Sequence, residues 1–291
     1  MIQNRYMKPK GENRMKRVAF LIFAAGIFCF STAAFAQTNG SIEAEELNYN
    51  INTKAASAVG SVVFTKGQDV LKGDRAEGFV DKQITMYGNP VRGDIVSRNA
   101  TVSASKAVWT ADPEVENSDC VEAFGEVKIR QGKVNFLNAP EVKVITGRKV
   151  YEAHGGVELL YNNIYAKAAD LMRSGEDFRG IKVAKLENRK EKYAISADEI
   201  YGKINEKDEV QSAVAHGKVV FDHTDKKGVK GRLFGDKAVY DKKSGNLVVT
   251  GNAHGIREDG KAIKADVLIY NEITKLVEAK GNSKITFVTD K

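Results

Sequence analysis

The residues of this 291-residue chain that could carry out chemistry are few, and four of them are histidines. They are His154, His216, His223 and His254. A zinc site needs several His, Cys, Asp or Glu ligands that converge, and the spacing of these histidines with the acids and cysteines indicates no such site. His154 and His216 fall at matching positions on the polar side of a repeated alternation, which predicts exposed strand residues. We therefore expect no metal and no cofactor.

Acidic residues recur along the chain, each after a small residue. The clearest are Asp74, Asp198, Asp236 and Asp266. Two carboxylates that flank a substrate would fit a glycosidase. A residue found once per repeat serves every repeat, however, so we interpret these acids as acceptors of hydrogen bonds from amides at a bend or bulge. The sequence also carries no phosphate-binding glycine loop, nucleophile elbow or zinc motif, and we expect no enzyme.

The elements that hold these residues are copies of one stretch, Ile195 to Phe221. Its first half places Asp198 after a small residue and before an apolar and aromatic pair. Its second half has an apolar or small residue at every second position. That set is Ala215, Gly217, Val219 and Phe221. A period of two predicts a half-buried β-strand.

The second half recurs from the first repeat to the end of the chain. The other clear copies are Ala58-Gly60-Val62-Phe64, Ala123-Gly125-Val127-Ile129, Ala153-Gly155-Val157-Leu159 and Ala279-Gly281-Ser283-Ile285. Weaker copies surround Gly88 and Gly251, and a degenerate one lies near Val183 to Leu186. Eight units of about thirty residues result, each of two strands. A period of this length indicates a repeat architecture, here all-β with about sixteen antiparallel strands.

Residues 1–36 have the order of a signal peptide. A basic leader precedes the apolar run from Val18 to Phe30, and Ala34-Phe35-Ala36 is a small-x-small cleavage site. The alternative is a permanent inner-membrane anchor, which the cleavage site argues against. The leader is long, and translation from Met15 would give a more ordinary signal. We expect export to the periplasm by a cleaved signal, leaving residues 37–291.

The charge of the exported part is almost balanced. The chain has 45 Lys and Arg and 38 Asp and Glu, of which the leader holds six and one, so 39 and 37 remain. A net charge of +2 gives no electrostatic reason to expect nucleic acid. One cysteine, Cys120, remains, so no internal disulfide can form and the sheet and core must supply the stability.

Residues 171–193 are the least regular part of the repeat array, with a charge run near their end. They fit either a hinge between two sub-blocks or a unit whose strands have polar outer faces.

The inner face of the stacked strands would carry a row of small residues beside rows of bulky apolar ones. Such a face could close on its partner as a sandwich core, or stay open along one side and hold an elongated apolar ligand. The candidate lining residues are Val62, Phe64, Gly125, Val127, Ile129, Val157, Leu159, Gly217, Val219, Phe221, Ile285 and Phe287.

The repeated motif, Ala-Asp with a following Tyr and then Ala-x-Gly-x-Val with an apolar end, resembles the OstA-like family, which includes the LptA-like periplasmic bridge of lipopolysaccharide transport. The resemblance covers about Ile42 to Phe287 and rests on repeated short motifs. It implies a twisted, partly open β-jellyroll whose groove carries the acyl chains of the lipid from the inner to the outer membrane. The chain is longer than the usual bridge protein and lacks the large C-terminal barrel of the outer-membrane member.

The two ends of such a stack are exposed edges, which can add a strand of a partner. The terminal strands near Ile42 to Tyr49 and Lys284 to Phe287 are the expected joints. Two facing sheets of eight strands would be roughly 38 Å long at ~4.8 Å per strand. We expect end-to-end association with other copies or with inner-membrane and outer-membrane transport proteins.

The chief alternative is a secreted β-solenoid, such as an adhesin or surface scaffold, which also shows repeats of this length. Its coils would need no glycine row, and it would bind no lipid.

Overall fold

The computed structural model describes residues 40–96, 99–111, 118–206, 208–225 and 227–287, which contain strands and turns and no α-helix. Within these ranges no helix is long and apolar enough to cross a membrane. The expected signal peptide, residues 1–36, lies outside the described residues. The all-β class is confirmed.

The chain crosses the molecule sixteen times, in agreement with the sixteen strands that the sequence predicted. We call each such run a crossing, whether it is one continuous strand or two strands separated by a short interruption. Ten are continuous: β3 (Ala55–Lys66), β4 (Asp69–Phe79), β5 (Gln83–Ile95), β6 (Ala100–Ala111), β7 (Asp119–Gln131), β8 (Asn135–Ile145), β13 (Asp177–Asn188), β14 (Tyr193–Ile204), β15 (Val210–Thr224) and β16 (Lys230–Asp241). Six are interrupted near their middle: β1 (Gly40–Glu43) with β2 (Glu46–Tyr49), β9 (Val150–His154) with β10 (Val157–Tyr161), β11 (Ile164–Ala168) with β12 (Asp170–Ser174), β17 (Asn246–Thr250) with β18 (His254–Arg257), β19 (Ala262–Lys264) with β20 (Val267–Asn271), and β21 (Leu276–Lys280) with β22 (Lys284–Thr286).

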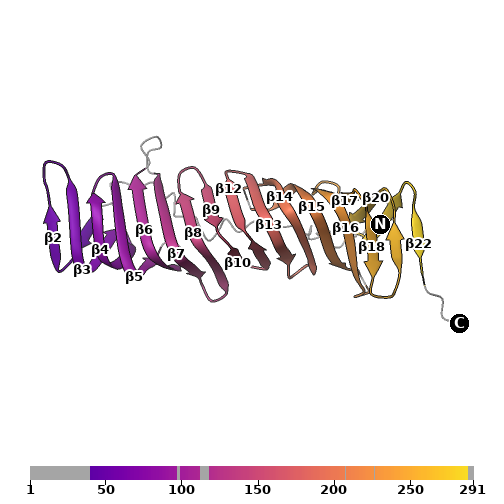
Figure 1. Ribbon diagram of the computed structural model, residues 1–291, viewed down its shortest axis with the longest axis horizontal. Helices are drawn as coiled ribbons and strands as arrows, with labels where there is room; N and C mark the ends of the chain where they lie inside the picture. The colour runs from indigo at the N-terminus through magenta and orange to yellow at the C-terminus, as the bar shows by residue number, and fades with distance from the viewer. Residues whose placement is uncertain (1–39, 97–98, 112–117, 207, 226, 288–291) are drawn as a thin grey trace, which may run out of the picture.

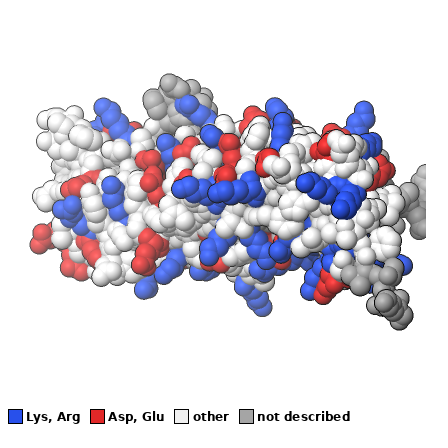
Figure 2. Space-filling view, turned by 45° about the vertical axis from the view of Figure 1, so that its right-hand side comes forward, with Lys and Arg blue, Asp and Glu red and all other residues white. Residues whose placement is uncertain are grey.

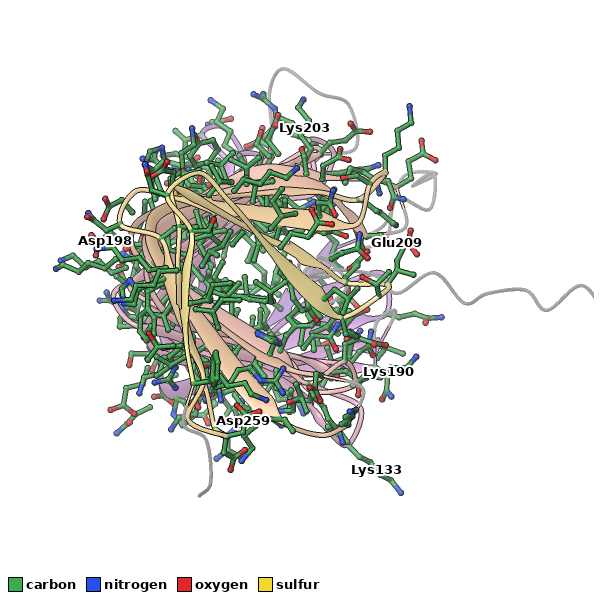
Figure 3. The ribbon with its side chains drawn as sticks, turned by 90° about the vertical axis from the view of Figure 1, so that its right-hand side faces the viewer. Lys133, Lys190, Asp198, Lys203, Glu209 and Asp259 are labelled. Carbon is green, nitrogen blue, oxygen red and sulfur yellow. The ribbon has the colours of Figure 1, made fainter. Side chains whose placement is uncertain are left out.

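Each crossing bends at its middle and so contributes to two layers. We call the layer with β2, β9, β12, β17, β20 and β21 the first layer, and the layer with β1, β10, β11, β18, β19 and β22 the second layer. On β15 the bend lies between His216 and Val219, where the pairing register shifts. Viewed from the C-terminal end, the layers meet near Asp198 and diverge toward the turns that carry Glu209 and Lys190 (Figure 3). The result is a jellyroll whose strands join the layers on one side.

Consecutive crossings pair antiparallel throughout the described strands. The coils of a β-helix instead stack parallel strands. The β-solenoid alternative is therefore wrong.

The stack is longer than the sequence predicted, because each crossing serves both layers (Figure 1). Sixteen strand segments per layer, and not eight, give about 77 Å at ~4.8 Å per strand. Repeat counting gave the correct number of strands but could not show that each one is shared between the layers.

The buried apolar residues form two clusters. The smaller lies between Ala58 and Ala107, and the larger extends from Ala104 to Tyr270. The larger cluster runs through residues 171–193 without a break. It includes buried residues before this segment, inside it and after it. The sub-block boundary near 171–193 stays a prediction, and the separation between clusters lies at β6.

Candidate functional site

The recurring glycines allow the strands to bend from one layer to the other. Gly217 has φ of 73° and the next residue, Lys218, has φ of 49°, both in the left-handed region. A Cβ at Gly217 would collide with the carboxylate of Asp198 on the adjacent β14. The same acid and glycine contact joins Glu45 to Gly60, Asp236 to Gly251 and Asp266 to Gly281. The acid of the first half of the repeat therefore packs against the glycine of the second half, on the adjacent strand, at the bend.

Among the recurring acids, Asp74 accepts a hydrogen bond from a backbone amide, as the sequence predicted, whereas Asp236 and Asp266 accept theirs from asparagine side chains. Asp74 accepts one from the backbone N–H of Asn89 at 3.1 Å. Asp236 accepts one from the side-chain amide of Asn252 at 2.8 Å. Among the described residues, no three His, Cys, Asp or Glu side chains gather as metal ligands would. The acids thus hold neighbouring strands in register at the bend.

Two of the candidate lining residues, Gly125 and Gly217, lie at these bends. The space beside them is filled by the exposed side chains of Ser105 and Asp198. The structure thus places both glycines against outward-facing side chains, because the bend turns them away from the space between the layers. A side chain added at either position would first disturb the bend.

Seven candidate lining residues lie in the interior between the layers. Each is at most 6% exposed: Val62, Val127, Ile129, Val157, Leu159, Val219 and Phe221. The ring of Phe221 lies 5.0 Å from that of Tyr270 in the first layer, measured between centroids. The interior is therefore apolar and filled along the middle of the molecule.

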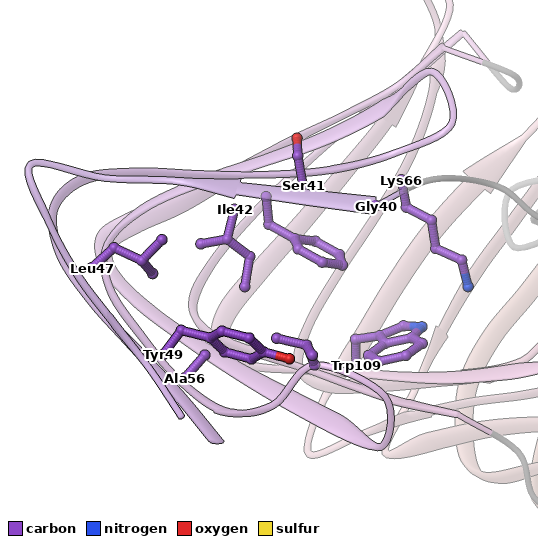
Figure 4. A pocket seen from close by; sticks show the side chains of 10 residues that line it. Gly40, Ser41, Ile42, Leu47, Tyr49, Ala56, Lys66 and Trp109 are labelled. Atoms are coloured by element: carbon purple, nitrogen blue, oxygen red, sulfur yellow. The ribbon is translucent and has the colours of Figure 1, made fainter. Parts of the chain in front are cut away.

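The interior opens at the N-terminal end into a cavity of about 450 Å³ (Figure 4). We call it the N-terminal mouth. Ile42, Leu47 and Tyr49 from the edge strand line it, together with Phe64 and Trp109. The rings of Phe64 and Trp109 are 6.2 Å apart and join the two layers. Phe64 is thus a predicted lining residue that lies at this mouth. The alternation did not predict the other four residues named here.

A second cavity of about 450 Å³ lies at the C-terminal end, and we call it the C-terminal mouth. Its apolar lining includes Leu233, Ile263, Val277 and Ile285. Ile285 is 62% exposed, and Phe287, which lies beyond β22, is 60% exposed. The last crossing has a neighbour on one side only in the described chain, which explains this exposure.

Opposite the bends lies the open side, where the layers end in turns and no backbone hydrogen bond joins one layer to the other within the described ranges. Buried polar residues gather beside these turns: Ser118, Thr146, Arg173, Asn188, His223 and Glu272. Near the N-terminal end, Lys66 of the second layer forms an ion pair of 2.5 Å with Asp119 of the first. Polar side chains and cross-layer ring contacts therefore close this side.

Two buried groups on the open side have perturbed pKa values. Burial raises the pKa of Glu272 to about 7, although the hydroxyl of Tyr240, 3.0 Å from Oε1, acts in the opposite direction. Burial lowers the pKa of His223 to about 4. Neither Glu272 Oε2 nor His223 Nδ1 has a hydrogen-bond partner among the described residues. At neutral pH the imidazole is therefore uncharged, whereas Glu272 is only partly ionised.

Sequence reasoning named His223 among the four histidines but did not place it in the interior, and it did not name Glu272. His216 and His254 are exposed and His154 is partly buried, as strand residues on an outer face would be. His223 lies two residues after Phe221, so the continued period of two would have placed it on the inner face. Glu272 follows Tyr270 in the same way, and this signal could have identified both.

Comparisons with known proteins give one family. The model of a family described as LptA/(LptD N-terminal domain) LPS transport protein matches residues 41–276. No curated protein matches the chain. Among solved structures, the chain is similar to LptH of Pseudomonas aeruginosa, described as the LptA homologous periplasmic component of the lipopolysaccharide transport device. The two share 10% identity over 54% of this chain and 96% of that one, with a TM-score of 0.33.

Proposed function

The chain belongs to the family of LptA and LptD N-terminal domain lipopolysaccharide transport proteins, and from this premise we propose that it is a periplasmic bridge that binds lipopolysaccharide. The acyl chains lie between the two layers and pass along them from the inner to the outer membrane. The protein performs no catalysis, and the driving force comes from its partners.

The observation that carries this proposal is the apolar interior that ends in a cavity at each mouth. Its middle is filled by residues such as Val219 and Phe221, so an acyl chain enters only when the layers part. The open side permits this movement, because side chains alone close it in the described structure. Each buried methylene contributes roughly 0.8 kcal/mol, which offsets the packing between the layers that their separation breaks.

The ends of the stack support association through edge strands. The first crossing, β1 and β2, carries an acid at its bend, Glu45, and the last, β21 and β22, carries a glycine, Gly281. The acid and glycine contact joins the first two crossings (Glu45 with Gly60) and the last two (Asp266 with Gly281), and the first and last crossings run in opposite directions. A second copy placed head to tail therefore continues both the antiparallel pairing and the repeat.

Charge also favours this arrangement of the ends. Residues 40–49 contain three acids, Glu43, Glu45 and Glu46, and no Lys or Arg. The last crossing and the residue before it contain Lys275, Lys280 and Lys284 against one acid. Elsewhere both signs of charge are interspersed on the face that Figure 2 shows. We propose that the partners are other copies and the inner-membrane and outer-membrane transport proteins.

Native mass spectrometry of the protein purified from a lipopolysaccharide-producing host tests the proposal. We expect adducts with the mass of lipid A-type molecules, on single copies and on end-to-end multimers. An unliganded monomer that also ignores added lipopolysaccharide would contradict it.

Two matched variants locate the lipid. Val219→Asp places a charge in the interior, where Val219 is 1% exposed, and should abolish the adducts. Val239→Asp places the same charge on an outer face, where Val239 is 37% exposed, and should retain them. Because Val219→Asp also costs stability, circular dichroism must first show that the variant is folded.

A further inference from the structure

The C-terminal mouth combines an apolar cavity with a cationic rim. Leu233, Ile263 and Val277 line the cavity between the layers. Four cations lie around it, namely Lys227, Arg257, Lys261 and Lys275. Such a site has the amphipathic character of a lipid whose chain is apolar and whose head is anionic.

Two of the four cations already have acidic partners. Arg257 pairs with Asp225 at 3.2 Å and with Asp259 at 3.3 Å. Lys261 pairs with Asp259 at 3.1 Å. The side-chain amines of Lys227 and Lys275 form no ion pair with any described residue. These two amines therefore remain available to an anion at the rim.

A buried polar group also faces the cavity. His223 lines it and is 5% exposed, and its Nδ1 has no hydrogen-bond partner among the described residues. Its ring packs against Phe221 and Tyr270, with centroids 5.8 and 4.8 Å away. An uncharged imidazole can donate or accept one hydrogen bond at this nitrogen, depending on its tautomer. The position suits an ester or hydroxyl oxygen where an acyl chain joins its head group.

The N-terminal mouth has a similar volume but a different charge. Lys66 is the one cation among its lining residues, and it is already paired with Asp119. The adjacent edge strand carries Glu43 and Glu46. This mouth can accept an apolar chain but repels an anionic head group.

We propose that the C-terminal mouth, and not the N-terminal one, binds the head end of a phosphorylated lipid. The acyl chain fills the cavity, Lys227 and Lys275 hold the phosphate, and His223 bonds to an oxygen at the head of the chain. This inference rests on the proposed function, since it names which end of the interior takes the head group.

Two fluorescent lipids with identical acyl chains test it, phosphatidic acid and the neutral diacylglycerol, each presented in detergent micelles to the full-length protein. Lys227→Gln with Lys275→Gln should weaken phosphatidic acid binding about tenfold, or about 1.4 kcal/mol, and leave diacylglycerol binding unchanged. The control pair, Lys133→Gln with Lys190→Gln, removes two exposed lysines from turns of the second layer and should change neither (Figure 3). High salt should remove the preference for phosphatidic acid.

A second variant tests the buried imidazole. His223→Phe keeps an aromatic ring between Phe221 and Tyr270 but removes both nitrogens. It should weaken binding of both lipids, since both carry ester oxygens, and leave their ratio unchanged.

The outcomes separate this inference from the proposed function. If neither lipid binds the unmodified protein, the proposed function fails. If both bind equally and the lysine variants change nothing, the head-group site is wrong while the apolar interior stands. If inorganic phosphate displaces phosphatidic acid with an equal affinity, the rim is a site for free phosphate and not for a lipid head group. A lysine variant that changes only self-association would reassign these cations to the acidic edge of a second copy.

Discussion

The pH dependence of stability should reveal two buried groups with opposite effects. Glu272 has its pKa raised to about 7, so between pH 4.5 and 7 the folded protein binds more protons than the unfolded chain. The free energy of unfolding therefore falls as the pH rises. His223 has its pKa lowered to about 4, so between pH 4 and 6.5 the unfolded chain binds more protons. Its contribution therefore rises with pH.

The magnitudes follow from about 1.4 kcal/mol per pKa unit. Between pH 5 and 8, Glu272 should reduce the free energy of unfolding by about 2 to 3 kcal/mol and His223 should increase it by about 2 kcal/mol. The unmodified protein should thus be almost independent of pH in this range. In Glu272→Gln only the His223 effect remains, so the free energy of unfolding should rise by about 2 kcal/mol from pH 5 to 8. In His223→Phe only the Glu272 effect remains, so it should fall by about 2 to 3 kcal/mol.

Urea unfolding followed by circular dichroism at pH 5, 6, 7 and 8 measures these differences. Tyr240→Phe provides a further control, because it removes the hydrogen bond that lowers the pKa of Glu272 and should move the loss of stability to higher pH. Parallel pH profiles for the unmodified protein, Glu272→Gln and His223→Phe would refute the reasoning.

Three further predictions concern the bend, the edges and the N-terminal mouth. Gly217→Ala should lower the free energy of unfolding, measured with urea, by about 1 to 2 kcal/mol, because φ of 73° disfavours a residue with a Cβ. Adding Asp198→Ala should recover only the part of this loss that comes from the collision with the Asp198 carboxylate. Lys280→Glu or Glu46→Lys alone should weaken self-association, and the two together should restore it; sedimentation that stays the same in all three would contradict the edge contact. Trp109 is the sole tryptophan, so added lipopolysaccharide should change its fluorescence if chains reach that mouth.

The sequence predicted the parts of the fold that depend on periodicity. Val219 and Phe221 stand at alternate positions of the repeat pattern, and the structure buries both. The pairing register shifts between Val183 and Leu186, where the sequence predicts a degenerate copy of the strand pattern. Alternation identifies the inner face of a strand because successive side chains point to opposite faces.

The remaining features depend on tertiary position, which periodicity cannot reveal. Gly217 shares the alternation of Val219, yet its backbone bends and turns it toward Asp198. Ile285 has the same repeat position as Phe221, but it lies on a terminal crossing and remains exposed. The burial of Glu272 depends on the opposite layer, which the local sequence does not specify.

The acid and glycine contact has a consequence for how such a molecule changes size in evolution. Because the described chain begins with an acid-bearing crossing and ends with a glycine-bearing one, duplication or loss of a whole unit leaves both terminal surfaces chemically the same. Each event changes the length by two strand spacings, about 10 Å. Under the proposed function, the reach of the protein can therefore change in fixed increments while the proposed docking edges stay the same.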